Sequence, residues 1–412
     1  MATAAAHKSL LESKPLRSQL PLMIVLALLS RLALALLYSH WNQMFALRSW
    51  GYENISIALA LNDGQGFASP FYFPSGPTAF MTPGYPIIIA AVIRILGAGV
   101  AAAWALILFQ ILLSTATLWL VMEVARNYFG VRVSNFAGLI YAVGWPIPMA
   151  SLYIWDTCLS ALILISAIAV APKLKSRSHF LWAGAGCAIA GLVNPSLLPS
   201  LGLILLWSAW QAQTVPWAAM LAFLVLFSPW PLRNYAKMHA FIPLRSNAPY
   251  ELWEGNRPGT DGETDPFAGP PRNRGESARF LAEGELGYMN EKRAIAVTWI
   301  AAHKSEFAKL TALRVIRFWS GSSKSPGSLI PLAIGGFAGL YLLRRAKRLL
   351  VLFSLPLIIF PLPYYITHAD ARFQFVIDPL LAMLAGYACE SFFAWCARRP
   401  APIPRLASAP AN

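Results

Sequence analysis

Long runs of apolar residues are the feature that most constrains the fold of this chain. A helix needs about 20 apolar residues to cross roughly 30 Å of hydrocarbon. Runs of this kind lie near residues 20–38, 102–124, 134–150, 153–171, 180–194, 196–211, 215–230, 328–343, 348–366 and 375–396. The 412 residues are 57% hydrophobic and only 12% charged, a balance that a water-soluble domain of this size does not have. We therefore predict an all-α integral membrane protein that crosses the bilayer about ten times.

Basic residues between these runs predict the orientation. One shorter apolar stretch, Tyr85 to Leu96, contains Arg94 and is flanked by Pro83, Pro86 and Gly97, which suits an interfacial or re-entrant helix better than a span. Lys and Arg concentrate in cytoplasmic loops of membrane proteins. If this stretch does not cross, every basic cluster falls on one side: Lys8/Lys14/Arg17, Arg126/Arg132, Lys173/Lys175/Arg177, Arg344/Arg345/Lys347/Arg348 and Arg398/Arg399/Arg405. If it crossed, the N-terminal cluster would oppose all the others.

The orientation predicts a multi-pass protein of the plasma (inner) membrane with both termini in the cytoplasm. We divide the chain into an N-terminal transmembrane domain (1–229), a long outer loop (230–328), and C-terminal transmembrane helices with a cytoplasmic tail (329–412). The first domain includes an outer loop at 39–101. No small-residue cleavage site follows the first apolar run, so we interpret it as a retained span. In the long loop, residues 257–275 predict irregular structure and 276–319 predict one or two amphipathic helices.

Several kinds of site are excluded or disfavoured. The net charge of +15 occurs in short clusters rather than one continuous patch, so nucleic acid is not an expected partner. The four cysteines lie in apolar stretches without a CxxC pair, which argues against a disulfide framework or a zinc site. Asp261, Glu263 and Asp265 alternate as metal ligands do, but position twelve of a calcium loop counted from Asp261 is Arg272, so an EF-hand is rejected. No Walker loop, GxGxxG or GxSxG motif is present.

Two acidic residues on the predicted outer face are candidates for catalysis. Glu53 lies in the first turn of a helix expected from about Tyr52 to the Asn62–Gly64 turn, and it is either a general base or an N-terminal charge that helps the helix start. Asp156 lies at the outer end of the fourth span, where a carboxylate is costly unless it is hydrated or paired. The alternative for Asp156 is an N-cap.

Two arginines work against the positive-inside bias. Arg233 follows the seventh span, and Arg372 lies in the last outer loop beside His368 and Asp370. An arginine can bind phosphate oxygens through two parallel hydrogen bonds, so both are candidates for binding a phosphorylated ligand. The alternative is that both side chains reach toward lipid headgroups.

Several sequence tracts on the predicted outer face, taken together in their order along the chain, resemble those of one enzyme family. These are GYENISIALALNDGQGFASPF with GPTAFMTPGYPIIIAAVIRILG, IWDTCLSALILI, SPWPLRNYAKMHAFIPLRSNAPYELWEGN, EGELGYMNEKRAIAVTWIAAHKSEFAKLTALRVIRFW, and HADARFQFVIDPLL. In this order they cover nearly the whole chain. They resemble GT-C membrane glycosyltransferases of the family 39 type, which are related to protein O-mannosyltransferases and lipid A aminoarabinose transferases.

The resemblance implies a GT-C-like helical bundle and an inverting glycosyltransferase. Such an enzyme moves a sugar from a polyprenyl-phosphate donor to a lipid, glycan or protein acceptor on the outer face of the cell envelope. Many relatives carry an Asp, or an Asp-Glu pair, where this chain has Tyr52-Glu53, so Glu53 alone would supply the catalytic carboxylate. Asp156 matches the second acidic position. The expected substrate-binding residues are Tyr52, Tyr85, Arg233, Arg245, Trp253, Asn256, His368 and Arg372.

No metal ligand and no certain cofactor is assigned at this point, and the use of a divalent cation is left open. Tyr52 and Trp253 could stack on sugar faces, although aromatic residues also anchor proteins at the interface. The main alternative function is a transporter or flippase for a lipid-linked or phosphorylated substrate. The polar residues argue against it because they collect at one face instead of the midplane. A lipid-binding scaffold without activity would have the same topology.

Overall fold

The computed structural model describes residues 18–42, 52–270 and 272–405, except for the side chains of 39–42 and Tyr52. The chain is 74% helical, and its described residues form no strand beyond isolated bridges. The predicted all-α class is therefore confirmed. The basic cluster Lys8/Lys14/Arg17 and residues 43–51 of the first outer loop lie outside the described residues.

Helices occupy every apolar run that the sequence predicts. They are α2 (Leu20–Asn42), α5 (Val100–Phe129), α6 (Val131–Val143), α7 (Thr157–Val170), α8 (Arg177–Val193), α9 (Leu198–Gln211), α10 (Trp217–Phe227), α15 (Ile330–Leu342), α16 (Lys347–Ile359) with α17 (Leu362–Ile366), and α18 (Asp378–Cys396). In the part of the chain that the structure describes, four stretches are long and apolar enough to cross a membrane: 20–38, 100–129, 347–366 and 378–396. The exact number of crossings remains a prediction.

Helix α18 forms the centre of the bundle, packed against α5, α6 and α15. Glycines allow the close approach. A Cβ atom added at Gly386 would lie 2.6 Å from the backbone nitrogen of Ala137 on α6, and one added at Gly339 of α15 would lie 2.0 Å from the carbonyl oxygen of Leu384. Small residues of this kind let helices associate in lipid, where burial of apolar surface supplies no driving force. Large apolar side chains remain exposed on the bundle surface, among them Leu29, Leu112, Leu221 and Ile334.

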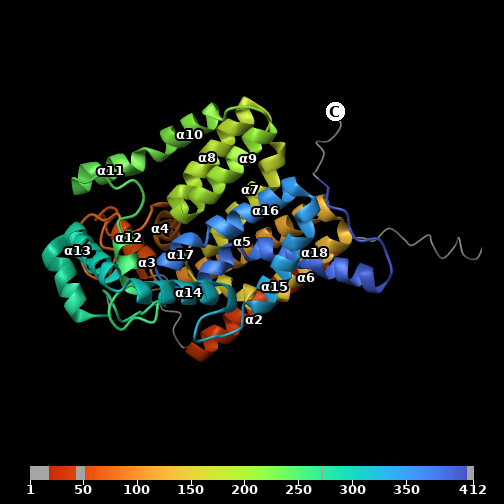
Figure 1. Cartoon of the computed structure of the whole chain (residues 1–412). Helices are drawn as coiled ribbons and strands as arrows, with labels where there is room; N and C mark the ends of the chain where they lie inside the picture. The colour runs from red at the N-terminus through yellow and green to blue at the C-terminus, as the bar shows by residue number, and fades with distance from the viewer. Residues whose placement is uncertain (1–17, 43–51, 271, 406–412) are drawn as a thin grey trace, which may run out of the picture.

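The longer segments between the membrane helices gather at one end of the molecule. Helices α3 (Tyr52–Asn62), α11 (Pro229–Met238), α12 (Ala248–Gly255) and α13 (Arg274–Ala302) lie at the left in Figure 1, with α14 (Lys304–Ser320) beneath. The predicted short helix at Tyr85–Leu96 is α4 (Gly84–Leu96), and it packs on α3 and α5. Residues 257–270 and 272–273 are not helical, as predicted for 257–275, although α13 already begins at Arg274. Gly284, with a φ of +69°, bends α13.

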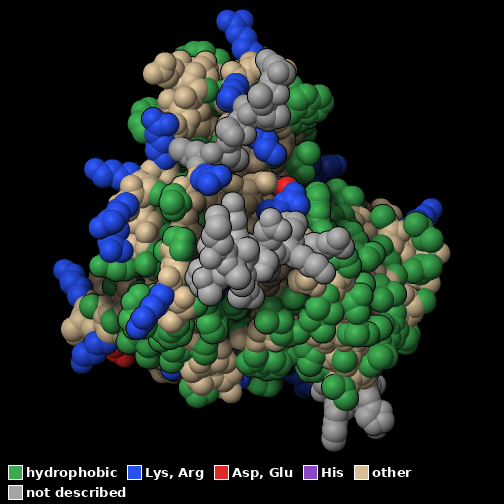
Figure 2. Space-filling view, turned by 90° about the vertical axis from the view of Figure 1, so that its right-hand side faces the viewer, with side chains coloured by type: hydrophobic (Ala, Val, Ile, Leu, Met, Phe, Trp, Pro, Cys, Tyr) green, Lys and Arg blue, Asp and Glu red, His purple; other side chains and the backbone are tan. Residues whose placement is uncertain are grey.

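The opposite end of the molecule is strongly basic. Exposed Lys and Arg side chains occupy the helix ends there, including Lys173, Lys175, Arg177, Arg344, Arg345, Lys347, Arg348, Arg398 and Arg399. Figure 2 shows this end, with many Lys and Arg side chains beside a broad apolar surface and very few Asp or Glu. The predicted clustering of positive charge on one side is therefore a feature of the folded chain.

Candidate active site

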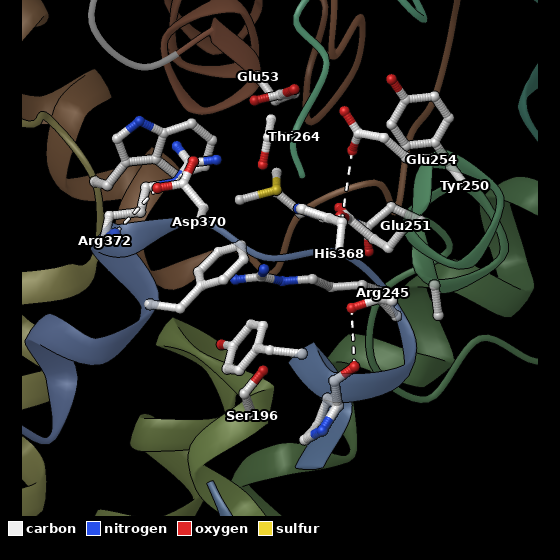
Figure 3. A pocket seen from close by; sticks show the side chains of 18 of the residues that line it. Glu53, Ser196, Arg245, Tyr250, Glu251, Glu254, Thr264, His368, Asp370 and Arg372 are labelled. Carbon is white, nitrogen blue, oxygen red and sulfur yellow. Dashed lines mark hydrogen bonds and ion pairs between the residues drawn. The ribbon is translucent and has the colours of Figure 1, made fainter. Parts of the chain in front are cut away.

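A cavity of about 580 Å³ lies at the end of the bundle where the loops gather. Its walls come from segments far apart in sequence: the start of α3, the residues before α7, the turn after α8, the loop between α11 and α12, α12 itself, and the segment from α17 into η6 (Ala371–Val376). Figure 3 shows the charged side chains that point into it. Its ionisable lining residues are Glu53, Asp156, Arg245, Tyr250, Glu251, Glu254, Asp265, Arg272, Lys324, Tyr364, His368, Asp370 and Arg372.

Glu53 lies in the first turn of α3, as predicted, and lines the cavity. Its Oε2 atom is buried and has no hydrogen-bond partner among the described residues. Burial raises the pKa of this carboxyl, while Arg372 and Arg245 act in the opposite direction. A helix-starting charge needs only a position near the N-terminus, but this carboxylate also faces the cavity. The position is therefore suited to accepting a proton there.

Asp156 occupies the N-cap position of α7, yet its side chain makes no capping hydrogen bond. Its Oδ2 atom instead lies 3.5 Å from the Ser160 hydroxyl and 3.9 Å from Nη2 of Arg245. Burial raises the pKa of this carboxyl, and Arg245 opposes the shift. The side chain is thus directed toward the cavity and its arginine, in contrast to what the capping alternative requires.

Arg245 and Arg372 bring positive charge to the same cavity as the two carboxylates. Arg372 pairs with Asp370 (Nε to Oδ2, 3.3 Å), and its guanidinium carbon lies 4.7 Å from the ring centre of Trp155. Nη2 of Arg245 lies 3.3 Å from the Val193 carbonyl oxygen, and its Nε atom is buried without a hydrogen-bond partner in the described chain. Both side chains therefore keep hydrogen-bonding capacity for an anion.

Two glutamates on α12 are cavity residues that the sequence reasoning missed. Glu251 and Glu254 are spaced i, i+3 and lie on one face of the helix, beside His368 (Figure 3). Nδ1 of His368 is 3.4 Å from Oε2 of Glu251 and 3.6 Å from Oε2 of Glu254. The ExxE spacing near the start of the long loop was a weak signal for this pair.

Four residues expected to bind substrate lie outside the cavity lining. Nη1 of Arg233 donates to the Thr78 carbonyl oxygen (2.6 Å) and Nη2 to that of Phe67 (2.5 Å), so this arginine holds the first outer loop. The Tyr85 hydroxyl is buried and accepts a hydrogen bond from Gln110 Nε2 at 2.6 Å. Two nitrogens of the Arg233 guanidinium are thus bonded to backbone oxygens of the first outer loop.

Trp253 and Asn256 are the other two. Trp253 packs in the core below Tyr250, with ring centres 5.6 Å apart, and Nζ of Lys292 lies 4.4 Å from its ring. The Asn256 amide donates to the Ile366 carbonyl oxygen at 2.9 Å and joins α12 to the end of α17. Tyr250 and Trp155, rather than Trp253, present aromatic rings to the cavity. Tyr52 begins α3, and its side chain lies outside the described part of the chain.

The alternating acids of the long loop are held by cations of the chain itself. Arg257 Nη2 is 2.6 Å from Oδ2 of Asp265, and Arg317 Nε is 3.1 Å from Oε1 of Glu263. Glu263 also accepts hydrogen bonds from the Ser323 backbone nitrogen and hydroxyl, both at 2.6 Å. These contacts give the acids a structural role in the loop.

No protein-family model and no curated protein matches the chain. Among solved structures it is similar to the Archaeoglobus fulgidus oligosaccharyltransferase tethered with an acceptor peptide, with a TM-score of 0.48, 13% identity and coverage of 92% of this chain but only 50% of that one. It is also similar to ArnT from Cupriavidus metallidurans bound to undecaprenyl phosphate (TM-score 0.39, 14% identity, 89% and 79% coverage) and to apo ArnT (0.36, 14%, 89% and 78%).

Both matched enzymes are GT-C membrane glycosyltransferases, the superfamily that the sequence resembles. Because the TM-scores lie below 0.5, the matches say what the chain is similar to and assign no residue or substrate to it.

Proposed function

We propose that this chain is an inverting glycosyltransferase that takes a sugar from a polyprenyl-phosphate donor and passes it to an acceptor at the outer face of the membrane. The observation that carries this proposal is the cavity in which two buried carboxylates, Glu53 and Asp156, meet two arginines, Arg245 and Arg372. A displacement at an anomeric carbon needs a carboxylate to accept the proton of the nucleophile and positive charge to stabilise the leaving phosphate.

The proposed reaction is a single displacement. A neutral hydroxyl or amine is a poor nucleophile, so Glu53 accepts its proton while the acceptor atom bonds to the anomeric carbon. At the same time the bond from that carbon to the phosphate oxygen breaks, and the lipid phosphate leaves with the electron pair. One displacement inverts the anomeric centre.

The arginines support the leaving group. Charge grows on the phosphate as its bond to the sugar breaks, and fixed donors in a partly dehydrated cleft stabilise that charge. Arg245 and Arg372 supply these donors in the proposal. Asp156, 3.9 Å from Arg245, orients that arginine or the sugar. Tyr250 and Trp155 provide ring faces on which a sugar can stack.

The basic end of the molecule supports the outer-face part of the proposal. Helices α7 and α18 begin beside the cavity and end toward the exposed Lys and Arg residues. The positive-inside rule assigns that basic end to the cytoplasm, which leaves the cavity on the outer side.

The test is mass spectrometry of lipid that purifies with the protein, followed by transfer assays in vesicles with the lipid so identified. A co-purified polyprenyl-phosphate sugar that the vesicles transfer to an acceptor supports the proposal. Movement of an intact lipid-linked substrate across the vesicle membrane, without cleavage of its sugar–phosphate bond, would favour the transporter alternative instead.

A further inference from the structure

Three residues of the cavity form a group that the proposed transfer does not use. Glu251 and Glu254 of α12 and His368 of the segment after α17 each direct one potential ligand atom to a common point. These atoms lie within 4.8 Å of one another. The two glutamates belong to the long outer loop and the histidine to the last outer segment. These parts are far apart in the sequence and meet only in the folded structure.

Each carboxylate is oriented by a hydrogen bond to its other oxygen. Oε1 of Glu251 accepts from the Asn247 amide at 2.7 Å, and Oε1 of Glu254 accepts from the backbone nitrogen of Asp265 at 3.0 Å. Oε2 of each is left facing His368. Metal-binding carboxylates are typically held in this way by partners behind them.

His368 provides an independent indication of a ligand. The residue is only 3% exposed, and its Nδ1 atom has no hydrogen-bond partner in the described chain although it points between the two carboxylates. A buried polar atom without a partner is costly.

The two separations measured from the imidazole agree with tetrahedral coordination. Zn²⁺ binds His nitrogen and carboxylate oxygen at about 2.0–2.2 Å, and the ligand atoms of a tetrahedron with such bonds are separated by roughly 3.4 Å. The observed separations from Nδ1 are 3.4 Å and 3.6 Å. Within the described residues neither carboxylate has a Lys or Arg ion-pair partner, so a cation would also compensate their charge.

We propose that Glu251, Glu254 and His368 bind one divalent transition-metal cation, Zn²⁺ or Mn²⁺, with a remaining coordination position open to the cavity. A mixed imidazole and carboxylate ligand set suits these ions better than Ca²⁺ or Mg²⁺, which take oxygen ligands. Sites with three protein ligands keep one position for water or substrate. This binding goes beyond the proposed transfer and does not require it.

The experiment measures metal binding by the full chain in detergent, without donor or acceptor. Protein treated with a chelator is dialysed against Zn²⁺ or Mn²⁺, and metal content and affinity are measured by mass spectrometry and calorimetry. We expect one ion per wild-type chain. Glu254→Gln and His368→Gln should weaken binding by more than about 100-fold, because even changes behind metal ligands cost roughly 10- to 100-fold. Asn247→Ala removes the hydrogen bond behind Glu251, so it should weaken metal binding by roughly 10- to 100-fold.

The matched control is Glu283→Gln, an acid-to-amide change at an exposed position of α13 outside the cavity lining. It should bind the ion like the wild type. X-ray absorption of the wild-type protein keeps the test decisive if a variant fails to fold, and we expect nitrogen and oxygen ligands only. No stoichiometric ion in the wild type, a sulfur ligand, or wild-type affinity in both ligand variants would overturn the proposal. None of these results depends on sugar transfer.

Discussion

At the residue scale, Arg233 and Arg245 show how similar side chains acquire different roles. Arg245 faces the cavity, whereas the guanidinium of Arg233 is bonded to two carbonyl oxygens of the first outer loop. Although both arginines lie in the same long loop, Arg245 is therefore available to a ligand, whereas Arg233 binds the protein's own backbone.

We predict that alanine has different effects at these two positions. Arg245→Ala should weaken retention of the polyprenyl phosphate by about 1.5 to 3 kcal/mol, because it removes a charged donor from a partly buried site. Arg233→Ala should chiefly lower thermal stability, because the carbonyl oxygens of Thr78 and Phe67 lose their hydrogen bonds to the guanidinium. Lipid retention and melting temperature are measured for both. The assignment is wrong if Arg233→Ala loses the lipid while Arg245→Ala retains it.

We predict that Glu53→Gln abolishes transfer while folding and donor binding stay near wild type. The amide keeps the shape of the carboxylate but cannot accept the proton, and general-base catalysis contributes roughly 10²- to 10⁴-fold. A lost helix-dipole interaction is worth at most about 1 kcal/mol at an exposed site, so it produces a much smaller effect.

The control for this experiment is Asp63→Asn, an exposed acid just beyond the other end of α3. It should transfer sugar at the wild-type rate in the same vesicles. A stable Glu53→Gln protein that stays within a few-fold of wild type would move the role of base to Asp156.

At the element scale, the first outer loop is held against the long outer loop by side chains from α11 and α13. Oε1 of Glu285 accepts hydrogen bonds from the Ala79 backbone nitrogen (2.9 Å) and the Ser246 hydroxyl (2.6 Å), and Thr78 donates to its other oxygen. The Ser246 nitrogen also donates to the Ala79 carbonyl oxygen at 2.9 Å. The cavity wall that carries Glu53 is thus joined to the wall that carries Arg245.

We predict that Glu285→Ala destabilises this junction by about 2 to 4 kcal/mol, because it leaves several buried donors unsatisfied. Glu283→Ala, an exposed change two positions earlier in α13, is the matched control and should have little effect. Thermal unfolding measures the loss, and limited proteolysis should cut residues 67–79 faster in the Glu285 variant. Equal stability of the two variants would contradict a role of Glu285 in joining the loops.

At the scale of the whole molecule, the basic end and the cavity end lie at opposite ends of the helix bundle. The positive-inside rule predicts that the cavity faces away from the cytoplasm. Single cysteines placed in a cysteine-free chain test this. Gln65→Cys and Ser305→Cys, both exposed at the cavity end, should react with an impermeant reagent in intact cells.

Ser176→Cys, exposed at the basic end between α7 and α8, should react only after the cytoplasm is opened. The reverse pattern would place the cavity in the cytoplasm. Reaction of all three positions in intact cells would instead show that the labelled cells were not sealed.

The sequence by itself determined the helical membrane class, the positions of the helices and the asymmetry of positive charge. These properties follow from local physical rules, since an apolar run and its flanking charges act on the bilayer without reference to distant residues. Even the short helix at 84–96 and the first-turn position of Glu53 could be predicted, because turn residues and helix ends are encoded nearby.

The composition of the cavity was decided only by the tertiary structure. Sequence reasoning put Asp156, Arg245 and Arg372 in one group with Glu53, and all four line the cavity. It could not separate them from Arg233, Tyr85, Trp253 and Asn256, which do not. It also missed the pairing of Glu251 and Glu254 with His368, which lies more than a hundred positions along the chain. Whether a polar side chain meets a ligand or a backbone carbonyl depends on which distant segment packs against it, and no local pattern contains that information.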